Sequence, residues 1–316
     1  MHKLIRSLFC AAGLLCLVTS TAFAAQVLAP GTDESDLVPT GKGWGERAYP
    51  APPRVNENAK APGQAGKTPS NGIFYHGGPL MLGTTNAYYI WYGNWSGNTA
   101  TSILTDFVKN VGGSPYFNIN TTYYDGLNSH VTGFVNLNGS TTDNYSQTAN
   151  LSDAAVQAVV ASAISSGKLG PPDTNAVYFV LTSADVNETS GFCTQYCGWH
   201  TRGTIAGSDI KYSFVGNPDR CPSACEAQTT GPNGNAGADG MASIIAHELE
   251  EATTDPDLNA WYDRRGQENA DKCAWTFGTT KTASNGSQYN MTLGTRNYLI
   301  QRNWVNASGG YCALSY

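Results

Sequence analysis

A nearly continuous apolar run, AVYFVLTSA at residues 176–184, limits the possible folds more than any other stretch of this chain. A strand with one face in water alternates apolar and polar residues, and this run does not, so both of its faces must be covered. Apolar residues at helical spacing in 99–111, 152–165 and 241–254 predict helices that can cover it. We therefore expect an α/β or α+β sandwich, in which helices pack on a mixed sheet.

Aromatic and β-branched segments predict further strands at 86–95, 119–124 and 130–137. Ser152 or Asp153 is expected to cap the helix at 152–165, which Gly167 ends. No internal repeat is visible, and the ordered part, residues 73–316, is expected to form a single domain with one large core.

The first 24 residues have the pattern of a secretory signal peptide: Lys3 and Arg6, then the apolar run LFCAAGLLCLV, then Ala22-Phe23-Ala24 as a cleavage site. Residues 25–72 are rich in Pro, Gly and polar residues and show no periodicity, which predicts a flexible leader or a pro-segment. Without the signal peptide the chain has 16 basic and 24 acidic residues, a formal charge of −8. We expect a protein secreted to a cell wall, periplasm or medium that binds neither nucleic acid nor, after cleavage, a membrane.

Six cysteines follow the signal peptide, and an even number in an oxidising compartment predicts three disulfides of open pairing. They are Cys193, Cys197, Cys221, Cys225, Cys273 and Cys312. The first four form two Cys-x-x-x-Cys pairs that flank KYSFVGN (211–217), which we predict to be an edge strand with its loops held by the pairs. A zinc site made of these four sulfurs is disfavoured by secretion and by the three-residue spacer.

The segment MASIIAHELEEATT predicts a helix that Asp239 caps and that ends at Thr254, before Asp255-Pro256. At about 100° per residue, Glu248 falls in the middle of the apolar face. A carboxylate there must be protonated, paired or bound to a cation, because an isolated buried charge is very costly. His247 and Glu251 lie together at the edge of that face, whereas Glu250 points the opposite way and is expected to be solvated.

This His-Glu-x-x-Glu pattern is one residue away from the helix of zinc peptidases. His247 and Glu251 would be metal ligands one helical turn apart, and Glu248 the general base that takes a proton from water activated by zinc. A carboxylate as second ligand also suits other cations. The pattern alone is weak, because acidic helices contain it by chance.

The third ligand has two candidate positions. Asp257 lies ten residues after His247, although Thr254 occupies the place where a glycine would turn the chain. Glu268 and Asp271 precede Cys273, whose disulfide would hold them over the helix, and we favour this later pair.

Other acids and histidines have simpler interpretations. His200 is expected to be a loop histidine and His76 a structural one, next to the tight turn Gly77-Gly78. Five acids offer a calcium site that stabilises the protein without catalysis: Asp255, Asp257, Asp263, Glu268 and Asp271.

Five segments run in order from Ile73 to the C-terminus: YHGGPLMLGTTNAYYIWYG, GFCTQYCGWH, YSFVGNPDRCPSAC, GPNGNAGADGMASIIAHELEEATTDPDLNAWYD, and RNYLIQRNW followed by YC. Together they resemble the EXORDIUM / phosphate-induced protein family. The resemblance implies a secreted protein of the kind found in plant cell walls, linked to growth and brassinosteroid response, with relatives in microbes. It implies no established reaction.

Carried onto this chain, the resemblance marks His247, Glu248, Glu251, Asn259, Trp261, Tyr262, Glu268, Asp271 and Cys273. Plant relatives have Asn in place of Asp255 and an apolar residue in place of Asp257, which argues against both as obligatory ligands.

Two hypotheses follow. The first is a zincin-like metalloprotein with hydrolase, peptidase-type chemistry, in which an extended peptide adds to the edge strand KYSFVGN. The second is a non-catalytic wall or matrix protein, in which Trp91, Trp95 and Trp261 contact glycans and the acids bind calcium or nothing.

Overall fold

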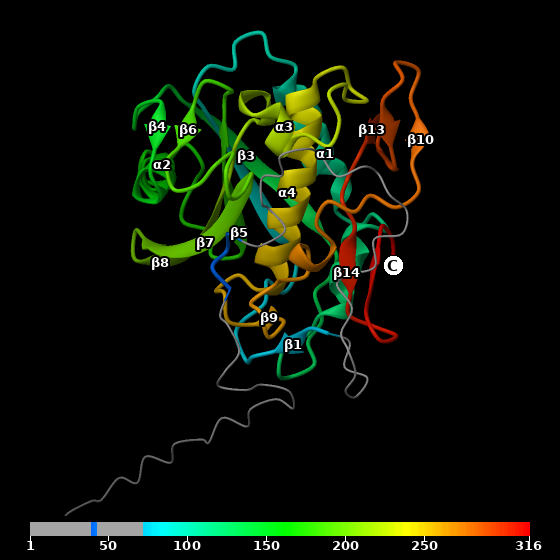
Figure 1. Ribbon diagram of the computed structural model, residues 1–316. Coiled ribbons are helices and arrows are strands. Elements are labelled where there is room, and N and C mark those ends of the chain that lie inside the picture. The colour runs from blue at the N-terminus through cyan, green and yellow to red at the C-terminus, as the bar shows by residue number, and fades with distance from the viewer. Residues whose placement is uncertain (1–38, 43–71) are drawn as a thin grey trace, which may run out of the picture.

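The computed structural model describes residues 39–42 and 72–316. At its centre is a five-stranded sheet in the order β3-β2-β5-β8-β7 (Figure 1). The strands are β2 (Thr85–Tyr92), β3 (Val135–Asp143), β5 (Ala176–Thr182), β7 (Gly198–Ile205) and β8 (Ser208–Val215). The first three and β8 run parallel, and β7 is antiparallel to β8, so the expected mixed sheet is confirmed. The expected signal peptide lies outside the described residues, as does the leader except for 39–42 and 72.

Strand β5 occupies the centre of the sheet, and all seven of its residues are buried, as its apolar sequence predicts. Helices α1 (Ala100–Val111) and α4 (Ala236–Thr254) cover one face, and α2 (Asp153–Ser165) covers the other (Figure 1). On the α1 side, the Tyr89 hydroxyl donates to the Leu104 carbonyl and its ring packs edge-on against Phe179. The helix-covered α/β architecture is thus confirmed.

The ends of the helices follow from local capping. Ser152 caps α2 by accepting a hydrogen bond from the Ala155 amide, as expected. The prediction for α4 was wrong at its start: Asn235, not Asp239, is the cap, and its side chain accepts from the Ala238 amide. The helix therefore begins one turn earlier, and it ends at Thr254 as expected.

Two predicted strands differ from the structure. Residues 119–124 belong mostly to a 3₁₀ helix, η2 (Phe117–Thr122), because the hydroxyls of Thr121 and Thr122 bond back to carbonyls three residues earlier. The strand expected at 130–137 is β3, which starts at Val135 and runs to Asp143.

The edge strand was also misassigned. Strand β8, which contains most of KYSFVGN, is internal, and β7 forms the edge. The turn at Ala206–Gly207 folds β7 and β8 into a hairpin, which places β7 outermost. In the second half of β7, exposed residues alternate with half-buried ones, as is typical of an edge strand with one face toward water.

Three disulfides form, as expected, and their pairing joins distant loops. Cys193–Cys221 and Cys197–Cys225 connect the segment before β7 to the segment after β8. Cys273–Cys312 attaches the C-terminal strand to the loop that carries Glu268 and Asp271. With all six sulfurs paired, the four-sulfur zinc site is excluded.

Short elements complete the fold. The two-stranded pairs are β1 (Phe74–Tyr75) with β9 (Trp261–Tyr262), β4 (Asn150–Leu151) with β6 (Asn187–Glu188), β10 (Lys281–Thr282) with β11 (Gln288–Tyr289), β12 (Met291–Leu293) with β13 (Arg296–Tyr298), and β14 (Asn303–Val305) with β15 (Tyr311–Ala313). The short helices are η3 (Pro218–Arg220), α3 (Pro222–Cys225) and η4 (Asp271–Cys273).

Within the described residues, no helix has the length and apolar character needed to cross a membrane.

Candidate metal centre

Helix α4 carries three side chains of the candidate site, His247, Glu248 and Glu251, and each is at most 1% exposed. The helix packs directly beneath β7, where Gly198 allows a close approach. A Cβ atom at Gly198 would lie 2.5 Å from Ile244 Cγ2 and 3.0 Å from Glu248 Oε1. Glu248 therefore lies between α4 and the edge of the sheet.

The His247 ring is oriented by contacts at both of its nitrogens. Nδ1 faces the side-chain amide of Gln301. Nε2 lies 2.9 Å from Glu251 Oε1 and 3.5 Å from Asp271 Oδ1. One ligand atom from each of these three residues lies within 4.8 Å of the others, which is a set able to hold a metal ion.

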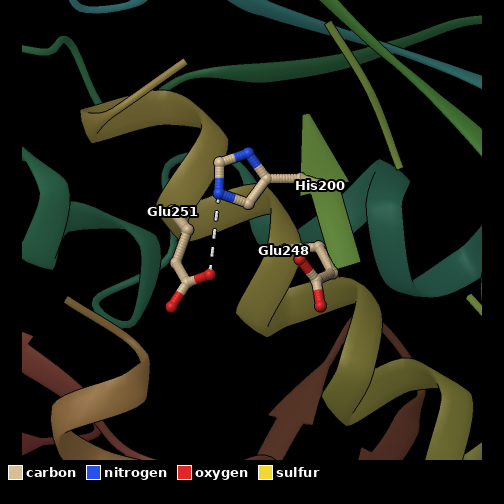
Figure 2. Close-up of side chains that lie close together, drawn as sticks. All are labelled: His200, Glu248 and Glu251. Atoms are coloured by element: carbon tan, nitrogen blue, oxygen red, sulfur yellow. Dashed lines mark ion pairs between the residues drawn. The ribbon is translucent and has the colours of Figure 1, made fainter. Parts of the chain in front are cut away.

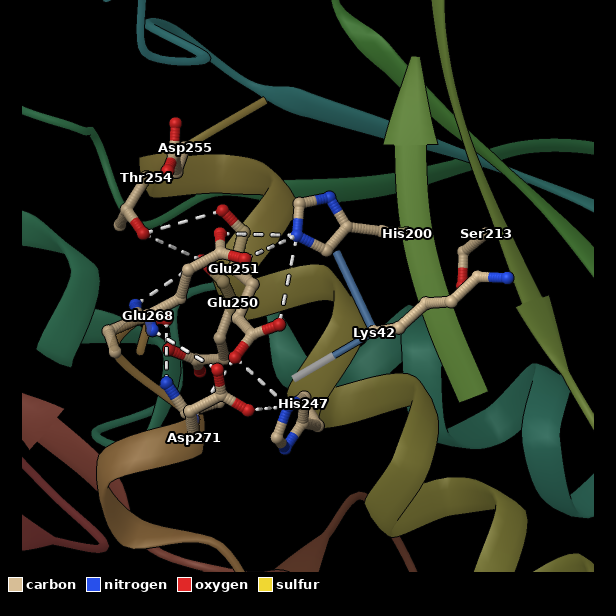
Figure 3. A network of polar contacts seen from close by, with 12 residues as sticks. Lys42, His200, Ser213, His247, Glu250, Glu251, Thr254, Asp255, Glu268 and Asp271 are labelled. Atoms are coloured by element: carbon tan, nitrogen blue, oxygen red, sulfur yellow. Dashed lines mark hydrogen bonds and ion pairs between the residues drawn. The ribbon is translucent and has the colours of Figure 1, made fainter. Parts of the chain in front are cut away.

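Glu268 reaches the centre from the loop that precedes η4, and Asp271 reaches it from the first position of η4 (Figure 3). The Asp271 amide donates to Glu251 Oε1 at 3.0 Å, and the Glu268 amide donates to Asp271 Oδ2 at 3.2 Å. The loop is thus bonded to the helix as well as held by the Cys273 disulfide. Asp271 and Glu268, the favoured candidates for the third ligand, thus both lie close to the candidate ligands of this site.

His200 is the residue that sequence reasoning missed. It lies on β7, not in a loop, and its fully buried ring points from the strand toward α4 (Figure 2). Its Nε2 lies 3.2 Å from Glu268 Oε1 and 3.7 Å from Glu251 Oε2. His200, Glu248 and Glu251 form a second set whose ligand atoms lie within 4.8 Å of one another. The two oxygens of Glu251 therefore face two different histidines.

The electrostatics show carboxyl groups crowded in a buried volume. Burial, followed by repulsion from Glu251, Asp255, Asp271 and Glu248, raises the pKa of Glu268 well above its ordinary value. Burial, together with the nearby His247, lowers the pKa of His200 to about 3, so its imidazole is neutral at physiological pH. Neutral imidazole and carboxyl oxygens are the donors that zinc and related cations take.

Glu250 corrects a prediction, because it is buried and not solvated. Its carboxyl accepts a hydrogen bond from the Asn303 side chain, and burial raises its pKa well above the ordinary value. Helix α4 is covered on almost every side, by η2 and β14 as well as by the sheet, so its outer face does not reach water.

The other acids do not gather into the expected calcium site. Asp257 lies 3.6 Å from Lys211 Nζ and 3.7 Å from Arg202 Nε, on strands β8 and β7. Asp255 accepts hydrogen bonds from two amides of the turn after α4, and Asp263 pairs with Lys272. Of the five, Glu268 and Asp271 are the ones near the histidines.

The aromatic residues proposed to contact glycans are not on the surface. Trp91, Trp95 and Trp261 are 6%, 8% and 3% exposed and pack in the protein's hydrophobic clusters. That part of the second hypothesis is wrong.

His76 is structural, as expected: its ring stacks on Tyr262 with a centroid distance of 3.5 Å.

A pocket lies beside the centre, one helical turn before His247. Ser243 and Ile244 of α4 line it, together with Trp275, Phe277, Leu299 and other residues. Gln301 lines this pocket and also contacts the His247 ring. The pocket is therefore adjacent to the candidate ligands.

Residues 73–313 match the model of the family described as the Phosphate-induced protein 1 conserved region. The chain is 32% identical to Protein EXORDIUM-like 3 of Arabidopsis thaliana over 75% of this chain and 81% of the relative. Protein EXORDIUM-like 5 of the same plant is 31% identical over 73% and 74%. Protein PHOSPHATE-INDUCED 1 of Nicotiana tabacum is 27% identical over 60% and 66%. No solved structure matches the chain.

Proposed function

This chain belongs to the phosphate-induced protein 1 family, which confirms the resemblance, and from that premise we propose that it is a secreted, zincin-like metallohydrolase acting on extracellular peptides. The three disulfides and the lack of a membrane-spanning helix among the described residues fit an extracellular protein. The proposed activity rests on the side chains around His247.

One observation carries the proposal: His247, Glu251 and Asp271 come from two separate segments and bring their ligand atoms together in a buried site. Burying several carboxyl groups beside one another is costly unless a cation offsets their charge. Burial and then the neighbouring carboxyl groups raise the pKa of Glu268, which means that its ionised form is unfavourable in this site. A bound divalent cation would offset the negative charge of these carboxyl groups.

The donor atoms fit zinc in kind and in spacing. Zinc takes one imidazole nitrogen and carboxylate oxygens at about 2.0–2.2 Å, so neighbouring donor atoms in a tetrahedral site are roughly 3.4 Å apart. The distances from His247 Nε2 to Glu251 and Asp271 are 2.9 and 3.5 Å. Calcium prefers oxygen donors alone, and the imidazole argues against it.

The remaining residues have defined roles in this proposal. Gln301 orients His247 through Nδ1. A half-turn of the glutamine amide exchanges its NH₂ and its oxygen, so the oxygen can accept a hydrogen bond from Nδ1–H and leave Nε2 free to bind a metal. Zinc, when bound, activates water for attack on a carbonyl group. Glu248, one residue after His247, would be the general base for that water. His200 and Glu268 complete the buried polar set beside it.

The surroundings provide places for a peptide. Strand β7 is an edge strand, and extended peptides bind such edges through backbone hydrogen bonds. The pocket formed by Ile244, Trp275, Phe277 and Leu299 is suited to an apolar side chain next to the reacting bond.

Elemental analysis of the purified protein tests the metal site, and we expect one equivalent of zinc per chain. His247→Ala and Glu251→Gln should lose the metal. Glu248→Gln should keep it and lose hydrolysis of a peptide library. Asp257→Asn is the matched control, because Asp257 is an acid near the end of the same helix that pairs with Lys211 and not with the cluster; it should keep both metal and activity. Folded protein that binds no zinc would end the proposal.

A further inference from the structure

Residues Pro39–Lys42 pack against the outer edge of β7 (short blue segment in Figure 1). The His200 amide donates a hydrogen bond to the Gly41 carbonyl at 3.0 Å. This is the type of bond that a peptide makes when it adds to the edge of a sheet. These four residues belong to the segment 25–72 that the sequence analysis describes as a leader.

Gly41 is needed for this close approach. Its φ is +67°, and a Cβ atom there would lie 1.9 Å from the His200 carbonyl oxygen and 3.5 Å from Leu258 Cδ1. Any other residue would therefore have to move away from β7. The segment passes next to the backbone of a residue whose side chain lies in the candidate metal centre (Figure 3).

Lys42 continues from Gly41 into a polar pocket on the α2 side of the sheet. Its ammonium lies 2.7 and 2.9 Å from the two oxygens of Asp153, and it donates to Ser190 Oγ at 2.6 Å. It also lies over the rings of Tyr196 and Trp199, at 5.2 and 5.3 Å from their centroids. Carboxylate, hydroxyl and aromatic faces are the groups that recognise an ammonium ion.

The pocket combines buried and exposed side chains: Glu188, Tyr196 and Trp199 are buried, whereas the side chain of Asp153 is 52% exposed. Glu188 is 1% exposed, and it accepts hydrogen bonds from the Tyr196 hydroxyl and from the Ser190 amide and hydroxyl. Its Oε1 atom is buried with no hydrogen-bond partner among the described residues. Trp199 is 2% exposed. Two carboxyl groups are thus connected to the cation of Lys42, Asp153 directly and Glu188 through the hydroxyl of Ser190.

We propose that the edge of β7 at His200, together with the pocket of Asp153, Glu188, Ser190, Tyr196 and Trp199, binds an extended peptide that carries a lysine or arginine, and that leader residues 39–42 occupy this subsite in the intact chain. The role of this subsite in catalysis rests on the proposed metallohydrolase function. The inference adds that the substrate carries a basic side chain and that the leader competes with the substrate within the same chain.

The test uses the full chain and a fluorescein-labelled tetrapeptide amide, Pro-Thr-Gly-Lys, with binding followed by anisotropy. Gly41→Val should displace the leader, because the new side chain collides with the His200 carbonyl. We expect it to bind the probe roughly 10–100-fold more tightly than the wild type. Lys42→Met removes the ammonium that pairs with Asp153 and Ser190, and it should also increase affinity for the probe. Lys168→Met is the control, since Lys168 is an exposed lysine outside the subsite, and it should leave binding at the wild-type level.

Replacing the lysine of the probe by norleucine, or introducing Asp153→Asn into the Gly41→Val protein, should weaken binding roughly 10-fold or more. Equal binding by wild type and both leader variants, or equal binding of lysine and norleucine probes, overturns the inference. Each measurement is repeated with a chelator present. Lysine-dependent binding that persists without metal supports the subsite even if no hydrolysis is found. Hydrolysis without a preference for basic residues leaves the metallohydrolase standing and refutes the subsite.

Discussion

The Nε2 atom of His247 lies 2.9 Å from an oxygen of Glu251, one helical turn further along α4, and neither side chain reaches solvent. In a solvated helix such an i,i+4 pair contributes little to stability. In this buried site it brings two donor atoms to the spacing of metal ligands, and Asp271, the first residue of η4, adds a third.

Gln301 is expected to affect metal affinity without contacting the metal. It contacts His247 Nδ1 and so fixes the direction in which Nε2 points. Replacing it with Leu should weaken zinc binding by about 10–100-fold, measured by competition with a fluorescent chelator. Gln228→Leu alters a glutamine that lines the same pocket and bonds to Gln288, and it should leave affinity unchanged. Equal effects of the two variants would contradict the positioning role.

The disulfides should differ in their effect on the centre. Removing Cys273–Cys312, which closes 39 residues, should cost about 4 kcal/mol of unfolding free energy on the chain-entropy estimate. Removing Cys193–Cys221 should cost less, because the intact Cys197–Cys225 closes nearly the same loop. Double Cys→Ser variants and thermal unfolding measure this. Zinc affinity should fall only in the first variant, because Cys273 anchors the loop that carries Asp271 and Glu268. A comparable loss of zinc in both would show that the loop is held by other contacts.

Gly198 should be required for the close packing of α4 on β7. In Gly198→Ala the new Cβ meets Ile244 and the carboxyl of Glu248, which should cost about 1–3 kcal/mol and lower kcat by displacing Glu248. Gly207→Ala serves as control: it lies in the β7–β8 turn at φ +77°, with nothing within 4 Å of an added Cβ. It should cost about 1 kcal/mol through the left-handed backbone alone and leave kcat unchanged.

Glu226 should make stability depend on pH, away from the metal centre. Burial, followed by repulsion from Asp219, raises its pKa from 4.5 to about 7. Between these values the folded protein binds more protons than the unfolded chain, so the stability that this group provides is complete below about pH 4.5 and is lost as the pH rises to 7. Glu226→Gln should therefore raise Tm at pH 8 and change it little at pH 4.5.

Asp125 should make stability depend on pH in the opposite direction from Glu226. Hydrogen bonds from the Ser129 and Leu127 amides lower the pKa of Asp125, so its contribution is present at neutral pH and is lost in acid. Asp125→Asn should lower Tm at pH 7 and have a smaller effect near pH 3. Parallel pH profiles for the two variants would contradict both assignments.

The amino-acid sequence by itself determined the elements whose signals are local. The apolar run of β5 can only be a strand covered on both faces, and the periodicity of α1, α2 and α4 specifies helices. The even number of cysteines led to three disulfides. Family membership also followed from ordered motifs, because these are properties of the chain itself.

Tertiary structure alone decided which residues share a site. Nothing within residues 198–205 indicates that His200 faces Glu268, because their contact joins positions 68 residues apart and depends on the β7–β8 hairpin forming the sheet edge. Glu250 was misjudged for the same reason: helical periodicity gives a direction around one axis, and the partners on that side, Asn303 among them, come from the end of the chain. Burial is a property of packing between segments, so only the folded chain establishes it.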